Sequence, residues 1–259
     1  MIKRFLRKAL AARQNRVVAR YHDFVNSFSS LSPQLVPGLP PGEKVVIFSP
    51  HCDDESLGCG GTLYKHHRQG HAIDAIFMTD GSMCDSQSEI REIVEIRKEE
   101  ARKASEVLGI GRCIFLDYPD RRLKATPQAI DQVTDLLQKS RPDLVYLPFY
   151  LDNHPDHMAT AIICLEAIRR RPVRSVFFYE IWTAMIPNHL VDIGGAMDKK
   201  LEAIRVYRSQ KGIDEFAEKT RSLNHYRSLL SGGRFQYAEA LLKTEEADWQ
   251  NILRQLHAR

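Results

Sequence analysis

The sequence of 259 residues predicts an α/β protein, in which a three-layer αβα sandwich on a mostly parallel sheet is followed by a helical carboxyl-terminal part. Two observations lead to this prediction. Short β-branched runs alternate with segments of helical periodicity between residues 44 and 182, as in successive βαβ units. The last third of the chain then has mainly helical spacing. Parallel strands joined by helices need helices on both faces of the sheet, which gives three layers.

The chain begins with a basic segment and a proline-rich connection, which together form residues 1–43. Lysines and arginines lie among apolar residues in the first part of this segment, a pattern that indicates an amphipathic helix. Two interpretations stay open: the helix packs on the domain by its apolar face, or residues 1–25 make peripheral contact with an anionic membrane surface. Prolines and glycines at residues 29–43 then predict an extended connection into a single domain over residues 44–259.

The predicted elements of that domain follow in order. Strands are expected where β-branched or aromatic runs are bounded by turn residues, at residues 44–49, 71–79, 112–117, 143–149 and 175–182. Helices are expected between them at residues 57–69, 89–108, 127–140 and 155–170. Later helices are expected at residues 197–207, at 213–230 and from 235 onward, with Gly232 and Gly233 separating the last two.

Composition argues against several classes of protein. Hydrophobic residues make up 43% of the chain and charged residues 27%, which is ordinary for a globular domain. No apolar run reaches the roughly 20 residues of a transmembrane helix, and arginines interrupt any signal-peptide core. The five cysteines are scattered, so we expect reduced thiols and a cytoplasmic protein, with contact at the inner membrane face left open. A net charge of +4 is too small to indicate a nucleic-acid partner.

Two clusters of acids and histidines each follow a predicted strand. The first strand leads into "FSPHCDDESLGCGG" (residues 48–61), and the fourth leads into "YLDNHPDHMAT" (residues 150–160). The carboxyl ends of parallel strands meet at one edge of an open sheet, where ligands bind. Carboxylates at such a place need a cation to offset their desolvation. The sequence therefore predicts a metal site at this edge.

Each residue of the clusters has a distinct expected role. His51, Asp54 and His157 form a set of two histidines and one carboxylate, which is typical of a catalytic zinc that keeps a position open for water. Asp53 could then act as the general base. His154 could stabilise a developing oxyanion or protonate the leaving group, and Asp156 could orient one of the histidines. We expect one zinc ion per chain.

At "SPHCDDESLGCGGTL" and "NHPDHMAT" the chain resembles the LmbE/PIG-L family of zinc-dependent de-N-acetylases, whose motifs are of the PHxDDE and HPDH types. The likeness covers roughly residues 44–240. It implies a Rossmann-like fold and hydrolysis of the N-acetyl group of an N-acetylglucosamine-type substrate, which leaves a free amine and acetate. By position it implies that His51, Asp54 and His157 bind zinc, that Asp53 is the general base and that His154 stabilises the oxyanion.

The resemblance also implies substrate contacts outside the two motifs. Arg97 occupies the helix position from which an arginine of the family reaches a substrate hydroxyl or phosphate. Asp120 and Glu180 follow strands and are placed to bond sugar hydroxyls. Cys52 stands where many members have proline, and we expect it to be a small filler. The resemblance does not identify the aglycone, and we expect a role in glycan, glycolipid or glycoconjugate biosynthesis. The oligomeric state is also left open.

Two other functions remain as alternatives. An Fe(II) oxygenase would use His51, Asp53 and His157 as a facial triad. Such enzymes suit antiparallel strands that form a double-stranded β-helix, whereas here strands alternate with helices. A noncatalytic sugar-binding relative would keep the pocket, but such relatives usually lose the base or a ligand, and both are present here.

Overall fold

The computed structural model describes residues 36–83 and 90–257. The expected amino-terminal helix and its membrane contact through residues 1–25 lie outside the described residues. The division of the chain at residue 43 stays a prediction. Among the described helices, none is both long enough and apolar enough to cross a membrane.

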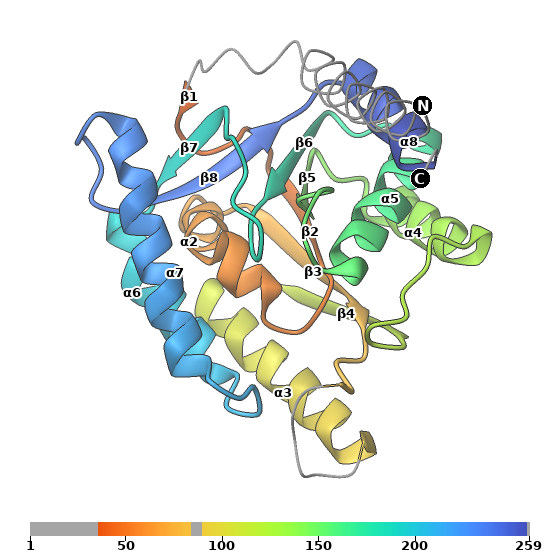
Figure 1. The fold of residues 1–259 in the computed structure, drawn as a ribbon, viewed down its shortest axis with the longest axis horizontal. Coiled ribbons are helices and arrows are strands. Elements are labelled where there is room, and N and C mark those ends of the chain that lie inside the picture. The colour runs from red at the N-terminus through yellow and green to blue at the C-terminus, as the bar shows by residue number, and fades with distance from the viewer. Residues whose placement is uncertain (1–35, 84–89, 258–259) are drawn as a thin grey trace, which may run out of the picture.

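An eight-stranded sheet forms the middle of the fold (Figure 1). Its strands are β1 (Val36–Pro37), β2 (Lys44–Ser49), β3 (Ala72–Thr79), β4 (Arg112–Tyr118), β5 (Leu144–Pro148), β6 (Ser175–Tyr179), β7 (His189–Asp192) and β8 (Ala238–Lys243). Their order across the sheet is β1-β7-β8-β6-β5-β2-β3-β4. Neighbours are parallel except at β8, which runs antiparallel to both β6 and β7. The expected mostly parallel sheet is confirmed.

Helices cover both faces of this sheet. They are α2 (Asp54–Arg68), α3 (Ile90–Leu108), α4 (Pro127–Ser140), α5 (Pro155–Arg170), α6 (Met197–Val206), α7 (Ile213–Ser228) and α8 (Glu246–His257), with short 3₁₀ turns η1 (Gly194–Ala196) and η2 (Leu229–Ser231). Figure 1 shows α2, α3, α6 and α7 on one side and α4, α5 and α8 on the other. The expected three-layer αβα arrangement is confirmed.

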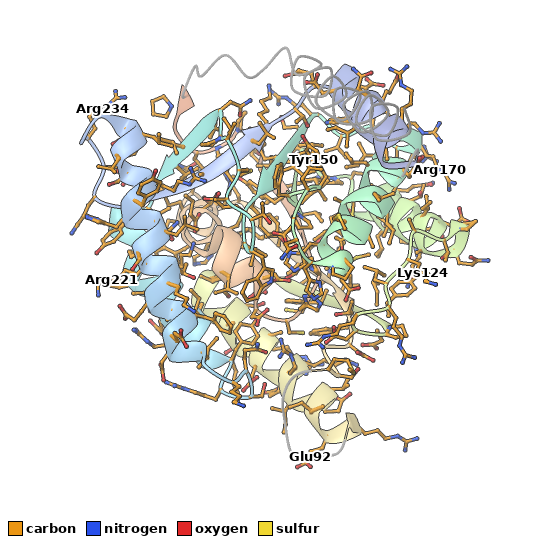
Figure 2. The ribbon with its side chains drawn as sticks, viewed as in Figure 1. Glu92, Lys124, Tyr150, Arg170, Arg221 and Arg234 are labelled. Atoms are coloured by element: carbon orange, nitrogen blue, oxygen red, sulfur yellow. The ribbon has the colours of Figure 1, made fainter. Side chains whose placement is uncertain are left out.

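The core divides between the two faces because successive side chains of a strand point to opposite sides. In β2, Val45 and Ile47 join the apolar cluster under α2, α3 and α6, whereas Val46 and Phe48 join the cluster under α4 and α5. Figure 2 shows Tyr150 inside the molecule, while the other side chains that it labels, all charged, lie at the periphery. The central strands β2, β5 and β6 are therefore almost entirely buried between the two layers of helices.

Two sequence predictions are wrong in detail. The helix expected from residue 235 onward contains β8, and only Glu246–His257 is helical. The segment 238–243 becomes a strand because it pairs with both β6 and β7, and such pairing overrides local preference. The strand expected at residues 175–182 ends at Tyr179. Strands β1 and β7 had no clear signal in the sequence.

The order in which successive strands are placed in the sheet reverses at β2. From β2 it adds β3 and β4 on one side, and then β5 pairs with the other side of β2. Ligands of open α/β sheets bind at the carboxyl ends of the strands beside such a reversal. The two acidic clusters follow β2 and β5, so both lie at this point.

Candidate metal centre

The first acidic cluster forms the turn from β2 into α2. Asp53 is the N-cap residue of α2 and has a φ of 132°, a conformation that residues other than glycine rarely adopt. Such strain persists only where the surroundings impose it, and it is common at functional sites. Within the turn, Asp54 Oδ2 accepts the backbone N–H of His51 at 2.9 Å. The turn thereby fixes the relative positions of His51, Asp53 and Asp54.

The second cluster begins α5. His154 is the N-cap residue, and its Nδ1 accepts the backbone N–H of Asp156 at 3.2 Å. Pro155 is the first residue of the helix, where its missing N–H is not needed. Asp156 and His157 follow in the first turn and are fully buried.

The three expected ligands come together. Asp54 Oδ2 lies 3.1 Å from His51 Nδ1 and 3.2 Å from His157 Nε2, so this oxygen lies between the two rings. Metal–ligand distances near 2.0–2.1 Å in a tetrahedral site put neighbouring donor atoms roughly 3.3 Å apart. The distance from Asp54 Oδ2 to each of the two ring nitrogens therefore matches that between neighbouring ligands of one zinc ion.

His154 lies close enough to compete for that role. Donor atoms of His51, His154 and His157 all lie within 4.8 Å of one another, as do those of His51, Asp120 and Asp156. However, Nδ1 of His154 accepts a hydrogen bond, so the neutral ring carries its proton on Nε2. A ring in that state donates a hydrogen bond and does not ligate through Nε2. This tautomer favours His154 as a donor to substrate over His154 as a ligand.

Asp156 and Asp120 both approach the far nitrogen of His51. His51 Nε2 lies 3.2 Å from Asp156 Oδ2 and 3.3 Å from Asp120 Oδ1. Asp156 is itself held by the backbone N–H groups of Arg121 (2.6 Å) and Leu123 (3.2 Å). A carboxylate on the second nitrogen orients a metal-binding histidine and leaves its first nitrogen free for the metal. Asp120, which we expect to bond a sugar hydroxyl, thus also contacts one of the expected metal ligands.

Asp152 is a residue that sequence reasoning missed. Its Oδ1 lies 3.4 Å from His157 Nδ1 and accepts the N–H of His154 at 2.9 Å. Its Oδ2 accepts the N–H groups of Trp182 at 3.1 Å and of Thr183 at 3.2 Å. One buried carboxylate therefore joins the histidines of α5 to the loop after β6. The available signal was an Asp two residues before His154, the spacing of an Asx turn.

Asp53 contacts Arg97 of α3. Arg97 Nη2 lies 3.4 Å from Asp53 Oδ2 and also donates to the carbonyl oxygen of Cys52, while its Nη1 donates to Gln210. Burial raises the pKa of Asp53 to about 7, although the charge of Arg97 opposes the increase. Arg97 thus touches the expected base directly, in addition to lining the cavity at this site.

The electrostatics of the cluster favour a cation. Burial opposes charge on both Asp54 and His157, yet their mutual attraction lowers the pKa of Asp54 and raises that of His157 to about 9. Both ring nitrogens of His157 are buried without a hydrogen-bond partner of good geometry among the described residues. A divalent cation between His51 Nδ1, Asp54 Oδ2 and His157 Nε2 would satisfy the nitrogen that faces Asp54. The residues present therefore fit a metal ion.

Glu180, which we expect to contact substrate, is not among the described residues that line the cavity at this cluster. It is buried, and its two carboxylate oxygens accept hydrogen bonds from Arg227. One of these oxygens also accepts the N–H of Met185 at 3.0 Å. A sugar hydroxyl would have to displace these donors. Glu180 instead anchors the loop after β6.

A cavity of about 270 Å³ opens beside the cluster. The described residues that line it are His51, Asp53, Asp54, Met83, Arg97, Asp120, Arg121, His154, Trp182 and Gln210. The expected base Asp53, two of the expected metal ligands and the expected oxyanion donor His154 thus line the same cavity. Cys52 is buried in the core, where burial raises the pKa of its thiol, so it stays a filler in our interpretation.

Residues 46–168 match the protein family described as PIG-L, GlcNAc-PI de-N-acetylase. The matched segment contains both acidic clusters. The chain is also 30% identical over 224 residues to diacetylchitobiose deacetylase from Thermococcus kodakarensis, a match that covers 77% of this chain and 82% of the relative.

Two further comparisons agree with this match. A probable N-acetyl-alpha-D-glucosaminyl L-malate deacetylase 2 from Bacillus anthracis is 30% identical over 185 residues, covering 64% of this chain and 80% of the relative. The solved structure of N,N'-diacetylchitobiose deacetylase from Pyrococcus horikoshii, in complex with its inhibitor MPG, has a TM-score of 0.71 at 26% identity. That likeness covers 80% of this chain and 87% of the other.

Proposed function

Because this chain belongs to the PIG-L family of GlcNAc-PI de-N-acetylases, we propose that it is a zinc-dependent hydrolase that removes the N-acetyl group from an N-acetylglucosamine-type aminosugar. The observation that carries the proposal is the convergence of His51, Asp54 and His157 beside the buried carboxylate of Asp53. The relatives named above as deacetylases of N-acetylated sugars support the substrate class.

In this proposal His51 Nδ1, Asp54 Oδ2 and His157 Nε2 hold one zinc ion per chain. Asp156 holds Nε2 of His51 and so leaves Nδ1 of that ring free, while Asp152 lies 3.4 Å from Nδ1 of His157. When bound, zinc acts as a Lewis acid that polarises the amide carbonyl and lowers the pKa of water.

The remaining steps belong to side chains of the protein. Asp53 accepts a proton on its carboxylate from the water that attacks the amide carbon. His154 donates its Nε2 proton as a hydrogen bond to the carbonyl oxygen, where negative charge develops. Asp53 then returns the proton to the amide nitrogen as the C–N bond breaks. The products are acetate and a free amine, and Arg97 keeps Asp53 in place throughout.

The biological setting is a further part of the proposal. We propose a role in glycan, glycolipid or glycoconjugate biosynthesis in the cytoplasm, with peripheral contact at the inner membrane face through residues 1–25. Those residues lie outside the described part of the chain. Co-sedimentation with anionic vesicles that does not change when residues 1–25 are removed would contradict the membrane contact.

Metal content and acetate release test the proposed activity together. The protein, purified without chelators, is analysed for bound metals and assayed for acetate release from N-acetylglucosamine and N,N'-diacetylchitobiose. We expect one zinc ion per chain and acetate release that a chelator abolishes and added zinc restores. An Asp53→Asn variant that keeps its zinc but releases little acetate serves as the matched control.

Other outcomes would point elsewhere. Bound iron with oxygen-dependent turnover would favour the oxygenase hypothesis. A folded protein that binds these sugars, retains no metal and releases no acetate would favour a noncatalytic sugar-binding protein.

A further inference from the structure

Trp182, in the loop after β6, lies between two hollows of the surface. It lines the cavity of about 270 Å³ beside the metal centre. It also lines a second, open hollow of about 630 Å³, whose other lining residues include Leu151, Asn153, Met158 and Thr183. The Trp182 side chain is 51% exposed. Among the described residues, Trp182 is the one that lines both hollows.

The loop that carries Trp182 is anchored on both sides of it. On one side, Asp152 accepts the backbone N–H groups of Trp182 and Thr183. On the other, Glu180 accepts the N–H of Met185, and Arg227 donates to the carbonyl oxygen of Met185 at 2.8 Å. The backbone that carries the exposed ring is therefore held by buried charged groups. An aromatic ring fixed before binding loses little freedom when a ligand packs on it.

Packing within the protein also orients the ring. Trp182 meets Phe216 of α7 edge to face, with ring centroids 5.5 Å apart and an interplanar angle of 79°. In such a contact the edge of one ring touches the face of the other. Half of the Trp182 surface stays open to solvent although its burial would favour folding. The exposed part of the ring, beside the cavity that it also lines, is therefore available for a ligand to pack on.

The size of the first cavity limits what it holds. Its volume of about 270 Å³ is slightly below the usual range of ligand pockets, which run from roughly 300 to 1,000 Å³. It suits one N-acetylated sugar unit. The C–H face of a second pyranose ring is apolar and flat enough to pack on an indole, while its hydroxyls can bond polar groups such as Asn153 and Thr183 at the hollow's rim.

We propose that Trp182 is the stacking platform of a second subsite, which binds the sugar ring next to the N-acetylated unit. The enzyme then acts on a disaccharide or longer oligosaccharide in preference to a monosaccharide. This inference rests on the proposed deacetylase function and names the substrate class of the same site. Trp182 determines specificity in it and takes no part in the chemistry.

The kinetic test compares N-acetylglucosamine with N,N'-diacetylchitobiose. We expect Trp182→Ala to lower kcat/KM for the disaccharide roughly 10- to 100-fold, mainly through KM. The loss for the monosaccharide should be clearly smaller, because only the disaccharide reaches the second hollow. Trp182→Phe should keep most of the preference. Ile186→Ala is the matched control, because Ile186 is in the same loop and 69% exposed but is not among the residues that line either hollow.

An equal loss on both substrates, no loss, or an equal effect of Ile186→Ala would overturn the proposal. Calorimetric binding of the two sugars provides a readout that does not depend on turnover. If the disaccharide binds at least about tenfold tighter than the monosaccharide and Trp182→Ala removes that difference, the subsite stands even where no acetate is released and the proposed function fails. Tighter binding of octyl N-acetylglucosaminide than of the disaccharide would assign the hollow to an alkyl chain and overturn a sugar subsite.

Discussion

Asp53 and Asp54 are adjacent carboxylates with different surroundings. Asp54 lies between two histidines, whereas Asp53 lies against Arg97. We therefore expect Asp53→Asn to retain zinc and to lower kcat roughly 10²- to 10⁴-fold, the usual contribution of a general base. Asp54→Asn should instead lose zinc. Elemental analysis and acetate assays on both variants check this, and loss of zinc from Asp53→Asn alone would show that the two roles are exchanged.

His154 and His157 allow a second test at the level of single residues. His157→Ala should release the metal, because two protein ligands would remain. His154→Ala should keep the metal and lower kcat roughly 10²- to 10³-fold, as expected when one oxyanion donor is removed. Zinc stoichiometry after dialysis separates the two variants. Metal loss from His154→Ala would mean that the three-histidine group is the ligand set.

Single residues also show which features of the site could be predicted from the sequence and which could not. His51, Asp54 and His157 could be grouped from sequence because they belong to clusters that follow β2 and β5, whose carboxyl ends lie side by side in the sheet. Glu180 follows a strand in the same way, but its carboxylate turns to Arg227, which is 47 positions further along the chain. Its partner depends on how α7 packs, and a sequence pattern does not contain that information. Asp152 went unnoticed for the same reason.

At the scale of elements, α2 carries the first cluster and packs unusually close to the sheet. A Cβ atom at Gly58 would lie 2.2 Å from Cδ2 of Tyr179, whose ring is fully buried and whose hydroxyl donates to the Phe48 carbonyl at 2.7 Å. Gly58→Ala must therefore push α2 away from β6. We expect a loss of roughly 1–3 kcal/mol in the free energy of unfolding and a weaker affinity for zinc.

Gly60 provides the matched comparison for this prediction. A Cβ atom there would lie 3.1 Å from Cγ of Lys200, so this side chain would have to move by only a few tenths of an ångström. Alanine also favours a helix by up to about 1 kcal/mol over glycine, so Gly60→Ala should be near neutral. Urea unfolding and zinc titration of both variants measure the difference. Equal stabilities would show that Tyr179 accommodates the added methyl group.

The strands up to residue 179 were easier to predict than β1, β7 and β8, which lie together at one side of the sheet. The strands from residue 44 to residue 179 have β-branched runs between turn residues, and all five were expected. In contrast, β8 has the sequence AEALLK, whose residues favour a helix. It forms a strand because β6 and β7 offer free edges on both sides. Pairing between distant segments decided its structure, and local preference did not.

At the scale of the whole molecule, the order of elements explains why the site could be located before its contacts were known. The reversal of strand order at β2 brings the ends of β2 and β5 together, whichever side chains they carry. The contacts of Asp120 and Asp152 depend instead on the conformation of loops. Rules of topology predict the place of a site, and the loops determine its outer hydrogen bonds.

A buried histidine away from the site links the stability of the whole fold to pH. His66 of α2 is fully buried, with Nδ1 2.8 Å from Nδ1 of His71 and Nε2 2.8 Å from the hydroxyl of Tyr146. Burial, assisted by the charge of His71, lowers the pKa of His66 to about 3. In the unfolded chain this pKa is about 6.5. Between these values the unfolded chain binds a proton that the folded protein does not.

The fold should therefore lose stability as the pH falls below about 6.5, by about 1.4 kcal/mol per pH unit from His66 alone. Above that pH the contribution of His66 is constant. His66→Gln keeps a polar side chain of similar size that does not titrate. Between pH 7.5 and pH 5 the variant should therefore lose about 2 kcal/mol less of its free energy of unfolding than the unaltered protein does. Urea unfolding of both proteins after metal removal excludes zinc release from the comparison. Parallel losses in the two proteins would mean that His66 is protonated in the folded state and that other groups set the acid limit of the fold.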